Sequence, residues 1–311
     1  MSADVRGANF RSWSDAMKIL LIGASGQLGT DLSQVLRRRG DTVIPVAHPE
    51  ADIRDSGRLN TVIVDARPDL VISTAAFHKV EECEMKPLVA FDVNAVGAIN
   101  LAKECQRMGC GLVYFSTDYV FSGAQRRPYS ESDLPQPLSV YGASKLAGEH
   151  LIVWGCERHF IVRTCGLYGL AGSSGKGGNF IENMLKKAVT AEPIRVVDDQ
   201  VLTPSYTVDV AEAVAKLVST ERYGTYHISN EGECSWYKFT KEAFGLEGLS
   251  ADLIPVATDQ FPSPVKRPAY SVLSKQKLTG IQIEMPQWQN ALARYLAARK
   301  EALSQGHLCP G

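Results

Sequence analysis

The sequence contains no long hydrophobic run. Apolar stretches such as ILLIG at residues 19–23 are short, whereas a helix needs about 20 apolar residues to cross a bilayer. The first sixteen residues are polar, lack an apolar signal-peptide core, and are followed by a strand-like segment at Met17. We therefore expect a cytoplasmic protein without membrane association, in which residues 1–16 form a disordered extension before the fold.

An excess of positive charge is also missing. Lys and Arg number 33 against 34 Asp and Glu, so the chain has no sequence-independent attraction to nucleic acid. Cys-x-x-Cys pairs and Cys–His clusters are absent too, and we expect no metal site. The seven cysteines show no pairing pattern, which is typical of a protein whose thiols stay reduced.

From Met17 onward the sequence does contain alternating strand and helix patterns. Short apolar runs, typical of strands buried on both faces of a parallel sheet, predict strands at residues 18–23, 42–47, 70–76, 111–117 and 160–164. Helical patterns separate them at about residues 27–39, 56–66, 81–108 and 141–157. This order predicts an α/β fold of the Rossmann type, a doubly wound parallel sheet with its ligand at the carboxyl ends of the strands.

The pattern becomes irregular after about residue 166. The segment GTYHISN at 224–230 is compatible with a further strand, and a last helix is expected over 287–303. We expect residues 17–165 to form a nucleotide-binding domain. Residues 166–311 are expected to form mainly a smaller substrate-binding lobe, with some segments returning to the first domain.

The segment GASGQLG, residues 23–29, follows the first predicted strand and opens the first predicted helix. Glycines at its first, fourth and seventh positions allow a sharp turn, close approach of the backbone to a pyrophosphate, and tight packing of helix on strand. The helix N-terminus then offers amide hydrogens to the phosphates. We assign to this dinucleotide site the residues Gly23, Ser25, Gly26, Gln27, Leu28 and Gly29.

The choice between NAD and NADP depends on the end of the second predicted strand. An acidic residue there would bind the ribose hydroxyls of NAD, but His48 stands at that end and Asp52 comes later. His48 would tolerate a 2′-phosphate, and Arg37, Arg38 and Arg39 are near in sequence. The alternative is that these side chains only face solvent. We expect NADPH or NADH as the cofactor, with NADPH slightly favoured.

Two tyrosines stand four residues before a lysine, Tyr141 in YGASK and Tyr237 in YKFTK. Tyr141 and Lys145 lie one helical turn apart, and Thr117 ends a predicted strand at the expected mouth of the site. A lysine ammonium ~4 Å from a tyrosine would stabilise its phenolate by about 4 kcal/mol and so lower a pKa that is ordinarily about 10. The trio predicts carbonyl reduction, with Tyr141 as the acid and Thr117 donating to the same oxygen. Tyr237 lacks such neighbours and is expected to pack in a helix of the smaller lobe.

Together these segments resemble the dTDP-4-dehydrorhamnose reductase family of extended short-chain dehydrogenase/reductases. MKILLIGASGQLG, STDYVFSG, YGASKLAGE and RPAYSVLSKQKL follow the order of that family. The resemblance implies NAD(P)H-dependent reduction of the C4 keto group of a nucleotide-linked 4-keto-6-deoxy sugar, most directly dTDP-4-dehydrorhamnose to dTDP-rhamnose.

The resemblance also assigns roles to individual residues. Catalysis falls to Thr117, Tyr141 and Lys145. Further cofactor contacts are implied at Asp52, Ile53, Ala75, Ala76, Phe77 and Asn94, and substrate contacts at Asp118, Tyr119, Asn179, Phe180 and Arg267. The implied partner is a nucleotide sugar, and a homodimer stays open.

The chain departs from the family pattern near the sugar. Gly166 stands where many members have a tryptophan, and Tyr270 replaces an asparagine. His78 and Glu81 replace a threonine and an aspartate, so the identity of the sugar stays open.

Two alternative functions follow from related proteins. A nucleotide-sugar dehydratase or epimerase is disfavoured because Tyr119 stands where dehydratases have a glutamate. The other is a non-catalytic NADP-binding module like the regulatory subunit of methionine adenosyltransferase.

Overall fold

The computed structural model describes residues 16–48, 50–171, 178–190, 192–261 and 263–306. The expected N-terminal extension, apart from Ala16, lies outside these residues. Within them, no helix is both long and apolar enough to cross a bilayer.

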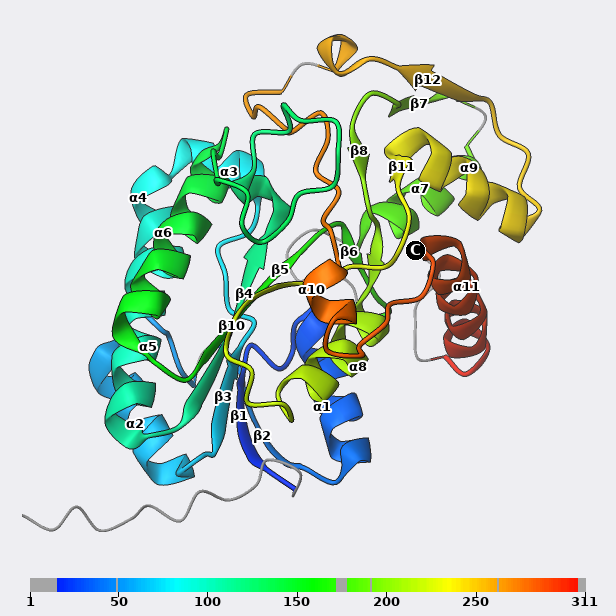
Figure 1. Ribbon diagram of the computed structural model, residues 1–311. Coiled ribbons are helices and arrows are strands. Elements are labelled where there is room, and N and C mark those ends of the chain that lie inside the picture. Colours follow the sequence, from blue (N-terminus) through cyan, green and yellow to red (C-terminus); the bar gives the residue numbers. More distant parts are fainter. Residues whose placement is uncertain (1–15, 49, 172–177, 191, 262, 307–311) are drawn as a thin grey trace, which may run out of the picture.

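The centre of the molecule is a six-stranded parallel sheet (Figure 1) with the order β10-β5-β4-β3-β1-β2. The predicted doubly wound α/β fold is confirmed. The five predicted strands are present, and the sixth comes from the segment at 224–230. Their bounds are β1 Lys18–Ile22, β2 Thr42–Val46, β3 Leu70–Ser73, β4 Gly111–Thr117, β5 His159–Thr164 and β10 Gly224–His227.

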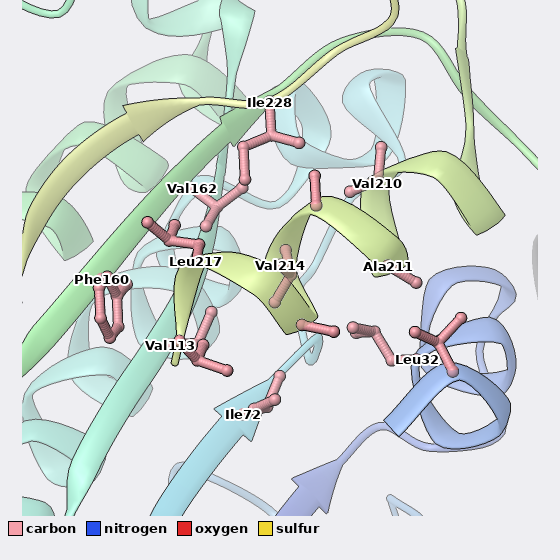
Figure 2. Packing of buried hydrophobic residues seen from close by; sticks show 14 of the residues in the cluster. Leu32, Ile72, Val113, Phe160, Val162, Val210, Ala211, Val214, Leu217 and Ile228 are labelled. Carbon is pink, nitrogen blue, oxygen red and sulfur yellow. The ribbon is translucent and has the colours of Figure 1, made fainter. Parts of the chain in front are cut away.

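Helices cover both faces of this sheet, because its strands carry apolar side chains on each face. Leu21 packs with the cluster under α1 and α8, whereas Leu20 packs with the cluster under α2, α5 and α6. Figure 2 shows Val210, Val214 and Leu217 of α8 lying over the strands of the first cluster. The bounds are α1 Gln27–Arg39, α2 Ser56–Ala66, α5 Gly97–Met108, α6 Val140–Gly155 and α8 Thr207–Leu217.

The helical pattern expected over about residues 81–108 is present, but it is not one continuous helix. The segment is divided into α3 Val80–Met85, α4 Pro87–Phe91, a π-helical turn η1 Asp92–Val96, and α5. Pro87 has no N–H and disfavours a helical conformation at the residue before it, and Lys86 accordingly has φ −131° and ψ 60°. In η1 the carbonyl of Asn94 accepts from the Tyr114 hydroxyl at 2.8 Å.

The later part of the chain builds a third apolar cluster beside the sheet. The last helix spans almost the expected residues. The remaining elements are η2 Asp118–Val120, β6 Leu167–Tyr168, α7 Phe180–Ala188, β7 Ile194–Val197, β8 Val201–Leu202, β9 Ser205–Tyr206, β11 Cys234–Ser235, α9 Trp236–Glu247, β12 Leu253–Val256, η3 Thr258–Gln260, α10 Gln276–Thr279 and α11 Trp288–Ser304. Small two-stranded sheets join β6 with β9, β7 with β12, and β8 with β11. We propose a division near residue 166, in which α8 and β10 are the segments that return to the nucleotide-binding domain.

Candidate active site

A cavity of about 950 Å³ lies at the carboxyl ends of β1, β3, β4 and β5. The predicted site residues come together there: all of them line the cavity except Gly29 and Asn94. Its second wall is formed by late segments that include Asn179, Phe180 and Arg267. Residues far apart in the sequence thus share one enclosed space.

Gly29 and Asn94 lie behind the cavity wall and support it. A Cβ atom at Gly29 would collide with the carbonyl oxygen of Gly23, so this glycine permits close packing of α1 on the loop. Asn94 is buried, and its side chain accepts from the Phe77 amide at 2.9 Å and donates to the Phe77 carbonyl at 3.0 Å. Asn94 therefore holds the backbone of a cavity-lining residue.

The glycine loop has the geometry that a pyrophosphate needs. Gly23 turns the chain with φ +80°, and a Cβ atom there would lie 2.5 Å from Thr74 Oγ1. Gly26 is the N-cap of α1 and has no side chain to bond the first amides of the helix. These N–H groups and the positive end of the helix dipole stay available to an anion.

In the part of the cavity that follows β2, the carboxylate of Asp52 is already paired with a cation. Arg54 donates to it from Nε at 3.0 Å and from Nη2 at 2.5 Å, and this hydrogen bonding holds the pKa of Asp52 at about 2. His48 and Ile53 line the same part of the cavity. The negative charge of Asp52 is therefore balanced by a neighbouring cation.

The three arginines considered from sequence for a 2′-phosphate lie elsewhere. They occupy the last turn of α1, at the opposite end from the glycine loop. Arg38 pairs with Glu212 and Arg39 with Asp41, while Arg37 donates to the carbonyl of Val43 at 3.3 Å. These side chains tie α1 to its neighbours, and the possibility that they line the cofactor groove is wrong.

Thr117, Tyr141 and Lys145 converge on the cavity from two elements. Thr117 ends β4, and Tyr141 and Lys145 stand one turn apart at the start of α6. Ser139 caps this helix by accepting from the Gly142 amide at 3.2 Å. Gly142 has no Cβ atom, which would collide with the carbonyl of Tyr119, so α6 can approach the end of β4 closely.

The electrostatics of the trio differ from the sequence expectation. Burial has the largest influence on Tyr141 and raises its pKa above the ordinary value, and an interaction with the Thr117 side chain opposes only part of that rise. Burial also lowers the pKa of Lys145 to about 7, and its Nζ lies 3.9 Å from the centre of the Tyr114 ring. The expected lowering of the Tyr141 pKa by Lys145 is therefore not produced, because burial dominates at both groups.

Glu149 lies one turn beyond Lys145, and its negative charge opposes the lowering of the Lys145 pKa by burial. Its carboxylate is shared with Arg163, which donates from Nε at 2.9 Å and from Nη2 at 2.6 Å in a buried ion pair. Because Arg163 already neutralises Glu149, little of this negative charge remains to hold Lys145 protonated.

Next to Thr117 in the chain, Asp118 is buried, and its carboxylate accepts hydrogen bonds from neutral groups. Its Oδ1 accepts from the Thr117 hydroxyl at 3.0 Å, and its Oδ2 accepts from the Cys165 thiol at 3.0 Å. Burial raises the pKa of Asp118, and hydrogen bonds from Ser271, Cys165 and Thr117 oppose that rise. Asp118 thus holds the Thr117 hydroxyl beside Tyr141.

Other predicted substrate residues are also held by protein contacts. Asn179 caps α7 through the Glu182 amide at 3.0 Å, and it donates to the carbonyl of Gly169 at 3.0 Å. Arg267 pairs with Glu81 and donates to Ser263 Oγ at 3.0 Å. The Arg267–Glu81 pair joins a late segment to α3 beside the cavity.

Of the four departures from the family pattern, Gly166, His78 and Glu81 line the cavity and Tyr270 does not. Gly166 has φ +54°, a left-handed conformation that favours glycine. Tyr270 donates from its hydroxyl to Glu233 at 2.5 Å, while His78 and Glu81 both line the cavity.

Sequence reasoning missed several residues of the later wall. Those lining the cavity include Tyr168, Gln200, Leu202, Trp236, Phe239 and Ser271. They come from short strands, a helix assigned only to packing, and a loop, and no local motif distinguishes them. Among the described residues, no group of three or more His, Cys, Asp or Glu side chains is arranged to hold a metal ion.

Comparison with known proteins agrees with this geometry. The family model described as RmlD substrate binding domain matches residues 17–301. The spore coat polysaccharide biosynthesis protein SpsK of Bacillus subtilis (strain 168) is 40% identical over 285 residues, covering 92% of this chain and 99% of SpsK. A dTDP-4-dehydrorhamnose reductase of Streptomyces griseus is 35% identical over 287 residues, covering 90% of this chain and 93% of that enzyme.

A crystal structure of dTDP-4-dehydrorhamnose reductase from Bacillus anthracis str. Ames in complex with NADP is also similar. Its TM-score is 0.87 at 36% sequence identity, covering 91% of this chain and 100% of that one. The chain therefore belongs to the RmlD substrate binding domain family, together with the dTDP-4-dehydrorhamnose reductases.

Proposed function

We propose that this protein is an NADPH-dependent reductase of the C4 keto group of a nucleotide-linked 4-keto-6-deoxy sugar, most directly dTDP-4-dehydrorhamnose. The observation that carries the proposal is the joint position of Thr117, Tyr141 and Lys145 in the cavity that the glycine loop also lines. The names of the reductase relatives support the same reaction. The name of SpsK, which refers to polysaccharide biosynthesis, is compatible with a nucleotide-sugar substrate.

The residues on the sheet side suit a dinucleotide. The glycine loop and the uncapped N-terminus of α1 would hold the pyrophosphate. Ile53, Ala75, Ala76 and Phe77 would line the remaining groove. The bound nicotinamide cofactor would supply the hydride for the carbonyl carbon.

NADPH is favoured over NADH by the state of Asp52. A free carboxylate beside the ribose would repel a 2′-phosphate, but Arg54 pairs with this carboxylate at 2.5 Å and provides a cation nearby. The NADP-bound relative from Bacillus anthracis supports the same choice.

Proton transfer is assigned to Tyr141. Its raised pKa keeps the phenol protonated at neutral pH, which is the form that can donate to the developing alkoxide. Protonated Lys145 would then stabilise the phenolate that is left. Thr117 would orient the substrate oxygen as a donor only after its single hydroxyl proton leaves Asp118, to which it donates in the structure without substrate.

Recognition of the nucleotide sugar is assigned to the later wall. Arg267 would bind the diphosphate with its guanidinium fork, and Glu81 would have to release it, since the two are paired. Asp118, Tyr119, Asn179 and Phe180 would surround the sugar.

The test is an assay of purified protein with NADPH and dTDP-4-dehydrorhamnose. We expect loss of the reduced-nicotinamide absorbance and formation of dTDP-rhamnose, identified by NMR. The C5-epimeric keto sugar and NADH serve as competing substrate and cofactor. If no keto sugar oxidises either cofactor, the reductase assignment is wrong and the non-catalytic module becomes the better explanation.

A further inference from the structure

An indole reaches the cavity from an element that the sequence assigned only to packing. Trp236 is the first residue of α9, is half-buried, and lines the cavity, as does Phe239 one turn later. Tyr237, between them, also packs against the apolar cluster of the later lobe, but it does not line the cavity. The two aromatic side chains of this helix that face the cavity therefore belong to its N-terminal turn.

The position of Trp236 is fixed from both sides. Before it, β11 pairs with β8, so that Cys234 lies opposite Leu202 and Ser235 opposite Val201. Ser235 then caps α9 by accepting from the Lys238 amide at 3.1 Å. A strand register and a helix cap thus orient the indole before any ligand binds.

A second aromatic ring completes the surface. The rings of Phe180 and Trp236 have their centres 4.3 Å apart at an angle of 44°. Phe180 is the first residue of α7 and also lines the cavity. Since both rings begin capped helices, they form a rigid apolar wall.

This wall adjoins the segment of Cys165 and Gly166, which also lines the cavity. Trp236 packs against the apolar cluster that contains Cys165 and Leu202. A Cβ atom at Gly166 would lie 3.0 Å from Leu202 Cδ1. The Cys165 thiol in turn donates to Asp118, whose carboxylate holds Thr117. A short chain of contacts therefore connects the indole to the polar groups at the reacting end.

A deoxyhexose matches this pairing of polar and apolar surfaces. Its oxygens can face Thr117, Asp118 and Tyr141, while its C–H face and methyl group need an apolar surface. An aromatic ring offers such a surface at little entropic cost because it is already ordered.

We propose that Trp236, backed by Phe180, forms the surface on which the 6-deoxy sugar packs, and that Trp236 is a specificity-determining residue of this cavity. This inference rests on the proposed function, because it identifies the part of the substrate that the later wall recognises. It predicts that the indole contacts the sugar and not the nucleoside diphosphate.

Tryptophan fluorescence tests this contact without turnover. The protein, saturated with NADP⁺, is titrated with dTDP-rhamnose or with dTDP, which lacks the sugar. We expect dTDP-rhamnose to change the emission of the wild type and of Trp154→Phe, a control at an exposed residue of α6. Trp236→Phe should bind the same ligand without that change, and dTDP should alter the wild-type emission much less.

Steady-state kinetics provides the second measurement. Trp236→Ala should raise KM for the keto sugar about tenfold and leave KM for NADPH unchanged, whereas Trp236→Phe should raise the sugar KM only about twofold to threefold. An unchanged sugar KM in Trp236→Ala would overturn the inference. An emission change that survives in Trp236→Phe would do the same, even if the alanine variant does not fold.

The two levels of proposal fail differently. If dTDP-rhamnose binds and the keto sugar is reduced, but Trp236 does not respond, only the sugar-contact inference is wrong. If neither nucleotide sugar binds the wild type and no NADPH is oxidised, the proposed function itself is wrong, and the inference is refuted with it.

Discussion

At the scale of single residues, burial determines the chemistry of the candidate site. Burial raises the pKa of Tyr141 and lowers the pKa of Lys145, because it disfavours both a phenolate and an ammonium. Neutral donors surround Asp118. The charged forms of Tyr141, Lys145 and Asp118 are therefore all disfavoured by burial in the site without ligands.

Replacing Tyr141 with Phe removes the proposed proton donor and little else. We expect kcat to fall by at least about 100-fold, while the affinity for NADPH, measured by fluorescence titration, stays within about twofold. Tyr237→Phe, at the second Tyr-x-x-x-Lys segment, is the matched control and should keep full activity, since Tyr237 does not line the cavity. Wild-type turnover in Tyr141→Phe would refute the assignment of the acid.

The low pKa of Lys145 predicts a stability change with pH. The unfolded chain holds this proton up to its ordinary pKa of 10.5, whereas the folded chain loses it at about 7. Between these values the unfolded state binds more protons, so rising pH stabilises the fold, by at most about 4–5 kcal/mol for a shift of this size.

Lys145→Met should remove this contribution. Urea denaturation of both proteins without cofactor, from about pH 7 to about pH 9, should show wild-type stability rising relative to the variant. A constant difference in unfolding free energy over that range would contradict the burial of Lys145 as a destabilised ammonium.

At the scale of elements, close backbone approach positions the residues proposed for catalysis. The start of α6 touches η2 where Gly142 meets the carbonyl of Tyr119. Tyr141 and Lys145 belong to this helix, so the distance between α6 and β4 determines how far both side chains lie from Thr117. A similar close approach at Gly29 sets α1 against the phosphate loop.

Gly142→Ala should therefore move α6 away from η2. We expect a loss of about 1–3 kcal/mol in unfolding free energy, as for other overpacked sites, and a fall in kcat. Gly245→Ala is the matched control, because Gly245 lies within α9 and a Cβ atom there would meet nothing within 4 Å. That control should gain about 0.5–1 kcal/mol and keep its activity; equal stabilities would contradict the close packing at Gly142.

At the scale of the whole molecule, the cavity is assembled by two parts of the chain. The sheet side supplies the glycine loop and the catalytic trio, and the late segments supply the opposite wall. The Arg267–Glu81 ion pair joins the two beside the cavity. Substrate diphosphate and Glu81 would compete for one guanidinium.

Arg267→Met should weaken binding of the nucleotide sugar without affecting binding of NADPH. Loss of a charge-assisted bidentate contact predicts a rise of at least about tenfold in KM for the keto sugar, with KM for NADPH unchanged. Glu81→Gln should have the opposite sign and lower the sugar KM, because it releases Arg267. If both variants keep the wild-type sugar KM, Arg267 does not bind the diphosphate.

Much of the fold and part of the site follow from local sequence. Continuous apolar runs gave five strands of the sheet near their observed bounds, because a strand covered on both faces needs apolar side chains at every position. The glycine spacing and the one-turn separation of Tyr141 and Lys145 are likewise local. Within the helical pattern at about 81–108, Pro87 was the local signal for the break between α3 and α4.

The tertiary structure alone decided the remaining features. Trp236 came to the cavity through the pairing of β11 with β8, and Asp118 gained Cys165 and Ser271 as partners from segments far along the chain. Burial reversed the expected pKa shift of Tyr141. Sequence determined which short elements form, because backbone preferences and apolar patterns act over a few residues. Contacts between distant segments depend on how those elements pack, and here that packing determines the wall proposed to select the sugar.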